Sequence, residues 1–304
     1  MSSLQRVAHV GASGFIGTAV LHALLDNNLD VTVLARKDSE SKFPGHVKVV
    51  RIDFSDRSSL VESLRGYDAV VSKVGVRAIN SQYEMIDAAV EAGVKRFIPS
   101  EYGCDITISK TANLPAYKER LDIKNYLQSK AETPETGFSY TTISTSILVE
   151  AVVGGPLPDI QPRARTATIY DGGDVPVSMT PASLVGEAVA AVLQHPEQTR
   201  NRSVLIHGGA FTQNQFLSIV QRCVGADGWQ VNRQDTSEME ERSWKAYEKT
   251  PKDVLSWLPG FVRLGLFGKG YGGDFTGRTA NEELGLKTIS LRDLDALIER
   301  LVSS

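Results

Sequence analysis

A glycine-rich segment near the N-terminus, Gly11-Ala12-Ser13-Gly14-Phe15-Ile16-Gly17, constrains this chain more than any other feature. Its glycines are spaced G-x-x-G-x-x-G, directly after an expected strand, Arg6–Val10, and ahead of an expected helix, Thr18–Asn27. One glycine permits the tight turn, one lets the backbone approach a pyrophosphate, and one lets the helix pack on the strand. Free N–H groups at the helix N-terminus favour the anion. The segment therefore predicts a dinucleotide site whose phosphate-binding residues are Gly11, Ser13, Gly14, Phe15, Ile16 and Gly17.

The rest of the first half alternates short β-rich runs with amphipathic helical patterns. This alternation is typical of a parallel sheet with crossover helices. The pattern predicts strands at Val31–Ala35, Val47–Ile52, Ala69–Ser72, Arg96–Pro99 and Tyr140–Thr145, and helices at Ser81–Ala92 and Tyr117–Lys130. We therefore expect an α/β fold, a Rossmann doubly wound parallel sheet with a smaller mixed C-terminal part.

The regular alternation ends after Glu150. Gly154, Gly155, Pro156 and Pro158 predict a loop, and we expect a dinucleotide-binding domain over residues 1–152 and a smaller substrate-binding part over residues 153–304. Beyond the loop, the pattern predicts the helix Ala182–Leu193, the strand Ser203–Ile206 returning to the main sheet, the helix Gln213–Cys223 capped by Thr212, the Gly-rich segment Gly265–Gly273, and a last helix that starts near Leu291.

Composition excludes several classes of function. The 33 Lys plus Arg and 36 Asp plus Glu give a formal net charge of -3, without the basic stripe that nucleic-acid or membrane-surface binding requires. Cys104 and Cys223 are too few for a disulfide framework or a zinc site, and the five histidines show no metal-ligand spacing. No signal peptide or long apolar run is visible. We expect a cytoplasmic monomer or homodimer that binds no metal and acts on a small molecule.

The end of the second expected strand indicates which dinucleotide is bound. An NAD site places an Asp or Glu there for the ribose 2′-hydroxyl, whereas this strand ends in Arg36-Lys37 and the nearby Asp38 comes late for that role. A guanidinium clamps a 2′-phosphate with two hydrogen bonds and a lysine adds a point charge, so Arg36 and Lys37 predict NADP(H). Asp53 ends the third strand, where it either meets the adenine edge or caps the helix that follows.

The segment that ends in Ala92-Gly93-Val94-Lys95-Arg96-Phe97-Ile98-Pro99-Ser100-Glu101-Tyr102-Gly103 is distinctive, as is the earlier Val70-Val71-Ser72-x-x-Gly75. Together with the glycine segment, they resemble the NmrA-like and isoflavone-reductase-like branch of the atypical short-chain dehydrogenases. Ile169-Tyr170-Asp171-Gly172-Gly173 and Asn201-Arg202-Ser203-Val204 resemble its fungal members. The resemblance implies NADP(H) binding, with Val74, Gly75, Ser100, Glu101 and Tyr102 on the nicotinamide side of the cofactor.

The resemblance also implies a catalytic lysine at the start of the helix after the fifth strand. An ungapped alignment on Tyr126-Leu127 puts Arg120 at that position, while a shift of two residues puts Lys118 there. Lys118 would act as a general acid, or would pair with Asp122 on the surface. Arg120 would anchor an oxyanion. Tyr102 would serve as an acid or as a wall of the nicotinamide site.

Two further patterns have a functional and a structural interpretation. Tyr126-x-x-x-Lys130 has the spacing of the wider superfamily's catalytic pair, but an amphipathic stripe is the simpler interpretation. Aromatic residues of the second half either line a substrate pocket or fill the core; they are Trp229, Trp244, Trp257, Tyr271 and Phe275.

The leading hypothesis is an NADP(H)-dependent oxidoreductase of a small, aromatic or polyketide-like secondary metabolite. One alternative is an NADP(H)-sensing regulator of the NmrA type without turnover. The other is a cofactor-binding enzyme that performs non-redox chemistry such as a cyclisation.

Overall fold

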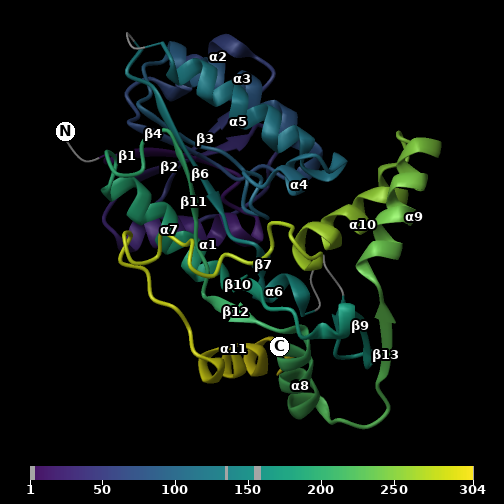
Figure 1. Cartoon of the computed structure of the whole chain (residues 1–304). Helices are drawn as coiled ribbons and strands as arrows, with labels where there is room; N and C mark the ends of the chain where they lie inside the picture. Colours follow the sequence, from purple (N-terminus) through teal and green to yellow (C-terminus); the bar gives the residue numbers. More distant parts are fainter. Residues whose placement is uncertain (1–3, 134–135, 154–158, 304) are drawn as a thin grey trace.

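The computed structural model describes residues 4–133, 136–153 and 159–303. The loop predicted at Gly154, Gly155, Pro156 and Pro158 therefore lies outside the described residues. Within the described part, a seven-stranded parallel sheet with the order β11-β6-β5-β4-β1-β2-β3 forms the centre of the molecule (Figure 1). Its strands are β1 Arg6–Val10, β2 Asp30–Arg36, β3 Lys48–Ile52, β4 Ala69–Ser72, β5 Arg96–Ile98, β6 Ser139–Ser144 and β11 Arg202–Leu205.

Helices cover both faces of this sheet, which is why β4 is buried at every position. On one face lie α1 (Phe15–Asp26) and α7 (Ala182–Gln194), whose apolar side chains share one core with β1 and β2. Gly186 lets these helices approach closely, because a Cβ there would lie 2.5 Å from the Ala19 carbonyl oxygen. On the other face lie α2 (Arg57–Leu64), α3 (Gln82–Glu91) and α5 (Lys118–Ala131).

The second half of the chain builds two small sheets beside the main one. One has the order β12-β10-β7, with β7 Ile147–Leu148, β10 Val177–Thr180 and β12 Gly209–Phe211; the other has the order β13-β9-β8, with β8 Ile160–Gln161, β9 Thr166–Tyr170 and β13 Gln230–Gln234. The helices of this region are α6 Val149–Val152, α8 Gln213–Val224, α9 Thr236–Lys249, α10 Val254–Phe267 and α11 Leu291–Ser303. Figure 1 shows α9 and α10 side by side at one edge of the molecule.

Short helical turns connect the strands at the edge where the main sheet ends. They are η1 Val76–Ser81 after β4, and α4 Ser109–Ala112 and η2 Pro115–Tyr117 between β5 and α5. The turn η4 Asp171–Gly173 follows β9 in the second half. None of the described helices is long and apolar enough to cross a membrane.

The predicted fold class is confirmed, with shifts of one to three residues at element ends. The helix after the glycine segment begins at Phe15 rather than Thr18, because Gly14 already serves as its N-cap. The strand predicted at Ser203–Ile206 pairs with β6 and completes the main sheet, and Thr212 caps α8 through a capping box with Gln215. The Gly-rich segment Gly265–Gly273 is helical at its start, since α10 extends to Phe267.

The proposed division of the chain after residue 152 follows the end of α6. The second part nevertheless contributes α7 and β11 to the Rossmann layers. A division in sequence is therefore not a division of the central sheet, and the two parts share a core.

Candidate functional site

A crevice of about 450 Å³ opens at the carboxyl end of the main sheet, beside β1, β2 and β4. We call it the β1–β4 crevice. Of the predicted cofactor residues, Gly11, Ser13, Gly14, Arg36, Val74 and Gly75 line it. Since open parallel sheets bind ligands at their carboxyl edge, the sequence-predicted phosphate site and the cavity coincide.

Backbone contacts explain the glycines of the loop. Gly11 has a φ of +80°, and a Cβ on it would lie 2.1 Å from the Lys73 carbonyl oxygen. A Cβ on Gly17 would lie 2.0 Å from the Gly11 carbonyl oxygen, whereas one on Gly14 would meet nothing closer than 3.5 Å. Gly11 and Gly17 are thus needed by the fold itself, and the space beside Gly14 is open. Phe15 and Ile16 form the first turn of α1, whose first N–H groups have no acceptor within the helix.

A buried histidine holds the loop against β4. The His9 ring lies between the Gly17 carbonyl oxygen at 3.0 Å and the Val71 carbonyl oxygen at 3.1 Å. Burial lowers the pKa of His9, so the ring is held neutral. His9 therefore has a structural role, holding the glycine loop against β4.

Two cations stand at the end of β2: Arg36 is its last residue and lines the crevice, and Lys37 follows it. Arg36 is exposed, with its Nε 3.7 Å from Asp38, and Lys37 places its Nζ 3.8 Å from Asp53. Such exposed pairs are weak, so both side chains are available to an anion. Asp53 does not cap α2, whose N-cap is Asp56; its carboxylate accepts hydrogen bonds from Ser55, and these lower its pKa.

The segments after β4 and β5 are tied together at the other end of the crevice. The Ser100 hydroxyl donates to the Val74 carbonyl at 2.8 Å, and the Ser100 N–H donates to the buried Gln82 side chain at 2.7 Å. Ser100 thus fixes the path of Val74 and Gly75 instead of facing the cavity. The sequence predicted the place of Ser100 but not this supporting role.

A buried carboxyl follows β5. Glu101 is 4% exposed and accepts a hydrogen bond from the Ser144 hydroxyl at 3.1 Å. Burial raises its pKa to about 7, against the opposing charges of Lys124 and Arg120 on α5. A carboxyl in this state both holds and releases a proton near neutral pH.

Tyr102 is strained and buried beside it. Its φ of 29° lies in the left-handed region, and its hydroxyl is buried without a hydrogen-bond partner among the described residues. Burial raises the pKa of Tyr102, so the phenol stays protonated. The strain and the unpaired hydroxyl are typical of a functional position.

The two candidates on α5 point in different directions. Lys118 is 70% exposed at its side chain and pairs with Asp122 at 2.5 Å on the outer face. Arg120 points inward, where its Nε is buried without a partner in the described structure, and its guanidinium lies 6.0 Å from the Tyr117 ring. Of the two, the structure brings only Arg120 to the buried group formed by Glu101 and Tyr102.

Tyr126 and Lys130 lie elsewhere, as the simpler interpretation predicted. The Tyr126 hydroxyl donates to Asp87 at 2.7 Å, and Lys130 pairs with Asp87 at 2.6 Å. Both side chains therefore connect α5 to α3, away from the β1–β4 crevice.

Two lysines that the sequence analysis passed over lie at the site. Lys73 lines the crevice directly after β4, with its Nζ 5.6 Å from the centre of the Tyr102 ring. The positive charge of Lys124 on α5 acts on Glu101 and opposes the rise of its pKa. The signal for Lys73 was its position between Ser72 and Gly75, at the carboxyl end of a strand that borders the glycine loop.

The aromatic residues of the second half mainly pack on one another. Trp244, Tyr247, Trp257 and Phe261 form edge-on contacts between α9 and α10, with ring centres 4.9 to 6.4 Å apart. Phe275 is fully buried. These side chains fill the core between two helices, so the structure favours the core interpretation.

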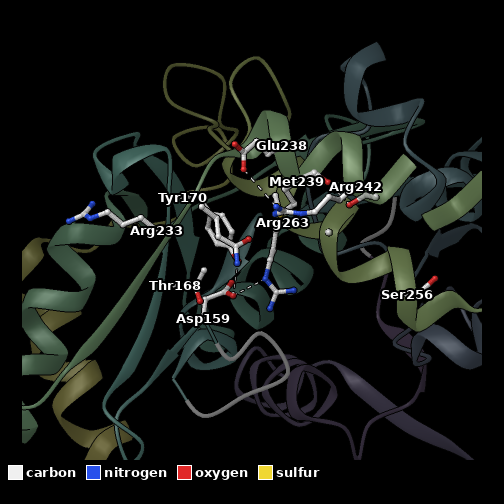
Figure 2. A pocket seen from close by; sticks show the side chains of 12 residues that line it. Asp159, Thr168, Tyr170, Arg233, Glu238, Met239, Arg242, Ser256 and Arg263 are labelled. Atoms are coloured by element: carbon white, nitrogen blue, oxygen red, sulfur yellow. Dashed lines mark hydrogen bonds and ion pairs between the residues drawn. The ribbon is translucent and has the colours of Figure 1, made fainter. Parts of the chain in front are cut away.

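A second cavity of about 660 Å³ lies between β9, β13, α9 and α10. Figure 2 shows the Asp159 carboxylate between Tyr170 and Arg263, with Arg233 pointing away from them. Asp159 pairs with Arg263 at 2.7 Å and accepts a hydrogen bond from Tyr170 at 3.1 Å. Asp159, Tyr170 and Arg263 therefore already satisfy one another inside this cavity. Among the described residues, no cluster of His, Cys, Asp and Glu is able to hold a metal ion.

Comparison with known proteins agrees with this geometry. The model of the NmrA-like family matches residues 3–238. The chain belongs to this family. The "Oxidoreductase aprR" of Aspergillus flavus is 34% identical over 303 residues, which cover 98% of each chain. The "Oxidoreductase poxI" of Penicillium oxalicum is 31% identical over 242 residues, which cover 78% of this chain and 75% of the relative.

Solved structures share the fold of this NmrA-like chain. A ternary complex of leucoanthocyanidin reductase from Vitis vinifera superimposes with a TM-score of 0.75 at 19% identity, covering 98% of this chain and 99% of that one. AtPrR2 with NADP+ and (+)pinoresinol superimposes with a TM-score of 0.73 at 20% identity, covering 99% and 100%. The family resemblance seen in the sequence is confirmed.

Proposed function

We propose that this chain is an NADP(H)-dependent reductase of a small aromatic or polyketide-like metabolite. The observation that carries the proposal is the β1–β4 crevice. It joins Arg36 at one end to Lys73 at the other, with the anion-binding glycine loop between them and the buried Glu101 and Tyr102 next to the Lys73 end. The names of the fungal relatives and of the solved reductases support this reading.

The residues present fit the cofactor. Gly11 and Gly17 allow a tight backbone turn in which a Cβ at either position would clash with neighbouring backbone atoms. The open space beside Gly14 suits a pyrophosphate at the N-terminus of α1. Arg36 and Lys37 stand where NAD sites have a carboxylate, and they match a 2′-phosphate. The bound cofactor supplies a hydride to a carbonyl or a conjugated double bond.

The protein's own groups orient the substrate and balance its charge. Arg120 and Lys124 bring positive charge to the buried edge of the sheet, where they stabilise negative charge that develops on a substrate oxygen. Glu101 holds a proton in the same region. Tyr102 walls this region and offers a phenol hydroxyl. We favour Arg120 over Lys118 as the anchor, since Lys118 is paired on the outer surface.

NADPH consumption tests the proposal. Purified protein is incubated without oxygen with NADPH and a panel of aromatic ketones, enones and (+)-pinoresinol, and NADP+ and reduced product are quantified together. The expected result is equal amounts of both for at least one substrate class. Tight NADPH binding with no turnover across the panel would support an NADP(H)-sensing regulator instead. Product formed without net NADPH consumption would support non-redox chemistry.

A further inference from the structure

The β1–β4 crevice holds only two charged side chains among the described residues that line it, Arg36 and Lys73. They stand at its opposite ends, because β1 and its glycine loop lie between β2 and β4 in the sheet. Two strand spacings place these ends about 10 Å apart. Arg36 is at the 2′-phosphate end of the proposed cofactor site, so Lys73 is at the opposite end, on the side where the nicotinamide would lie.

The backbone of Lys73 is held rigidly. Its N–H donates to the Val10 carbonyl at 2.8 Å, and its own carbonyl oxygen fills the space that a side chain on Gly11 would need. Lys73 is therefore fixed by the same contacts that shape the phosphate loop. A group on so rigid a segment suits precise positioning.

The side chain of Lys73 is half-buried and lacks an acidic partner. Its Nζ lies over the ring of Tyr102, which belongs to the segment after β5. The positive charge of Arg120 on α5 also acts on it. No carboxylate of the described residues acts on it. Burial, followed by the charge of Arg120, lowers the pKa of Lys73 to about 8. By contrast, Lys118 is exposed and paired, and Asp122 raises its pKa.

We infer that Lys73 is a proton donor of the reduction, a role that rests on the proposed function. NADPH delivers a hydride, with both electrons, to the substrate carbon and leaves as NADP+. The Nζ–H bond of Lys73 breaks, and its proton goes to the substrate oxygen. The neutral amine then regains a proton from water. A donor whose pKa lies near the working pH suits this step better than a guanidinium does.

Amine labelling tests the position of Lys73 without any substrate. The protein is acetylated briefly with acetic anhydride across a range of pH, with and without saturating NADP+, and each lysine is quantified by peptide mass spectrometry. We expect the labelling of Lys73 to rise around pH 8, well before that of Lys118, and to fall at least tenfold when NADP+ is bound. If Lys73 is labelled with the same pH dependence as Lys118 and NADP+ does not reduce its labelling, the proton-donor role of Lys73 is overturned while the proposed function stands.

Kinetics of variants test the proton transfer. Lys73→Met and Lys73→Arg should each slow single-turnover hydride transfer by about 10²–10⁴, with NADPH affinity changed less than about threefold. Wild-type turnover should fall as the pH rises through about 8, because the donor must be protonated, and Lys73→Met should lose that limb. Lys245→Met, on the exposed face of α9, is the matched control and should behave as the parent.

The alternative outcomes are distinct. Recovery of the rate in Lys73→Arg would mean that the site needs only a positive charge, and a large loss of NADPH affinity at an unchanged hydride rate would make Lys73 a cofactor anchor. Either result overturns proton donation while leaving the proposed function intact. Absence of turnover by the parent protein across the whole substrate panel would refute the proposed function and the proton-donor role together.

Discussion

The substitution Glu101→Gln tests whether the buried carboxyl of Glu101 ionises only near neutral pH. Glu101 is buried and its pKa is raised from an ordinary 4.5 to about 7. In the unfolded chain the carboxyl ionises at its ordinary pKa, so the unfolded state loses its proton first as the pH rises. Glu101 therefore makes its full contribution to the free energy of unfolding at low pH, and this contribution is lost as the pH rises through about 7.

The size of the effect follows from the pKa difference. The full shift corresponds to about 3 kcal/mol, of which about 2.5 kcal/mol falls between about pH 5 and about pH 8. Gln has no charge to bury. The free energy of unfolding of Glu101→Gln should therefore rise by about 2.5 kcal/mol relative to that of the parent between about pH 5 and about pH 8. Urea unfolding at the two pH values measures it. Glu248→Gln, at an exposed position of α9, is the control and should show no such change.

A stability difference between Glu101→Gln and the parent that is the same at both pH values would contradict a raised pKa of Glu101. It would mean that Glu101 ionises in the folded protein as it does in water. The Lys124 and Arg120 charges would then offset the effect of burial, and the carboxyl would be an anion at neutral pH.

Three other predictions concern the cofactor and the substrate anchor. Calorimetry should show NADPH bound at least about tenfold more tightly than NADH, with Arg36→Asp shrinking or inverting the preference; equal affinities in the parent would contradict the 2′-phosphate assignment. Gly14→Val should keep the parent's melting temperature yet lose NADPH binding, whereas Gly17→Val should also lower the melting temperature, since its side chain meets the Gly11 carbonyl; normal binding by Gly14→Val would misplace the pyrophosphate. Arg120→Ala should raise the Michaelis constant by about tenfold or more, with a smaller fall in turnover, while Lys118→Met should stay near the parent; the reverse pattern in steady-state kinetics would restore Lys118 as the catalytic residue.

The Rossmann half of this fold could be predicted because its signals are local. The glycine loop, the strand before it and the amphipathic helix after it lie within consecutive residues, and buried parallel strands appear as short apolar runs. Even the return of β11 was visible, as a β-rich run after a predicted helix. The pairing of such strands needs no information beyond their order and the handedness of the crossovers.

The second half could not be predicted in the same way. The strand β13, Gln230–Gln234, is exposed throughout and has no apolar alternation, and its partner β9 is distant in the sequence. The helix α10 contains Pro259, Gly260 and Gly265, which are loop signals. In the structure these glycines allow close contacts, because a Cβ on Gly260 would lie 2.0 Å from Ser243 and one on Gly265 would lie 2.3 Å from Tyr117.

The cofactor half of the site was visible in the sequence, and the reactive half was only partly so. Backbone-shaped phosphate loops need glycines, and glycines are conspicuous. Lysines such as Lys73 and Lys124 usually lie on the surface, and only the packing of α5 and the Tyr102 segment brings their charges to this site. The same packing leaves Lys118 on the surface, although its sequence position is close to that of Arg120.

NADPH deuterated at the transferable position shows whether this chain passes a hydride from the cofactor to a substrate. The protein is incubated with labelled cofactor and the substrate panel, and the product is analysed by mass spectrometry, with Gly14→Val as the matched control. We expect one deuterium in each product molecule for each NADP+ formed, and none with the control. A product without deuterium, or tightly bound NADPH that no substrate consumes, would contradict this hydride transfer.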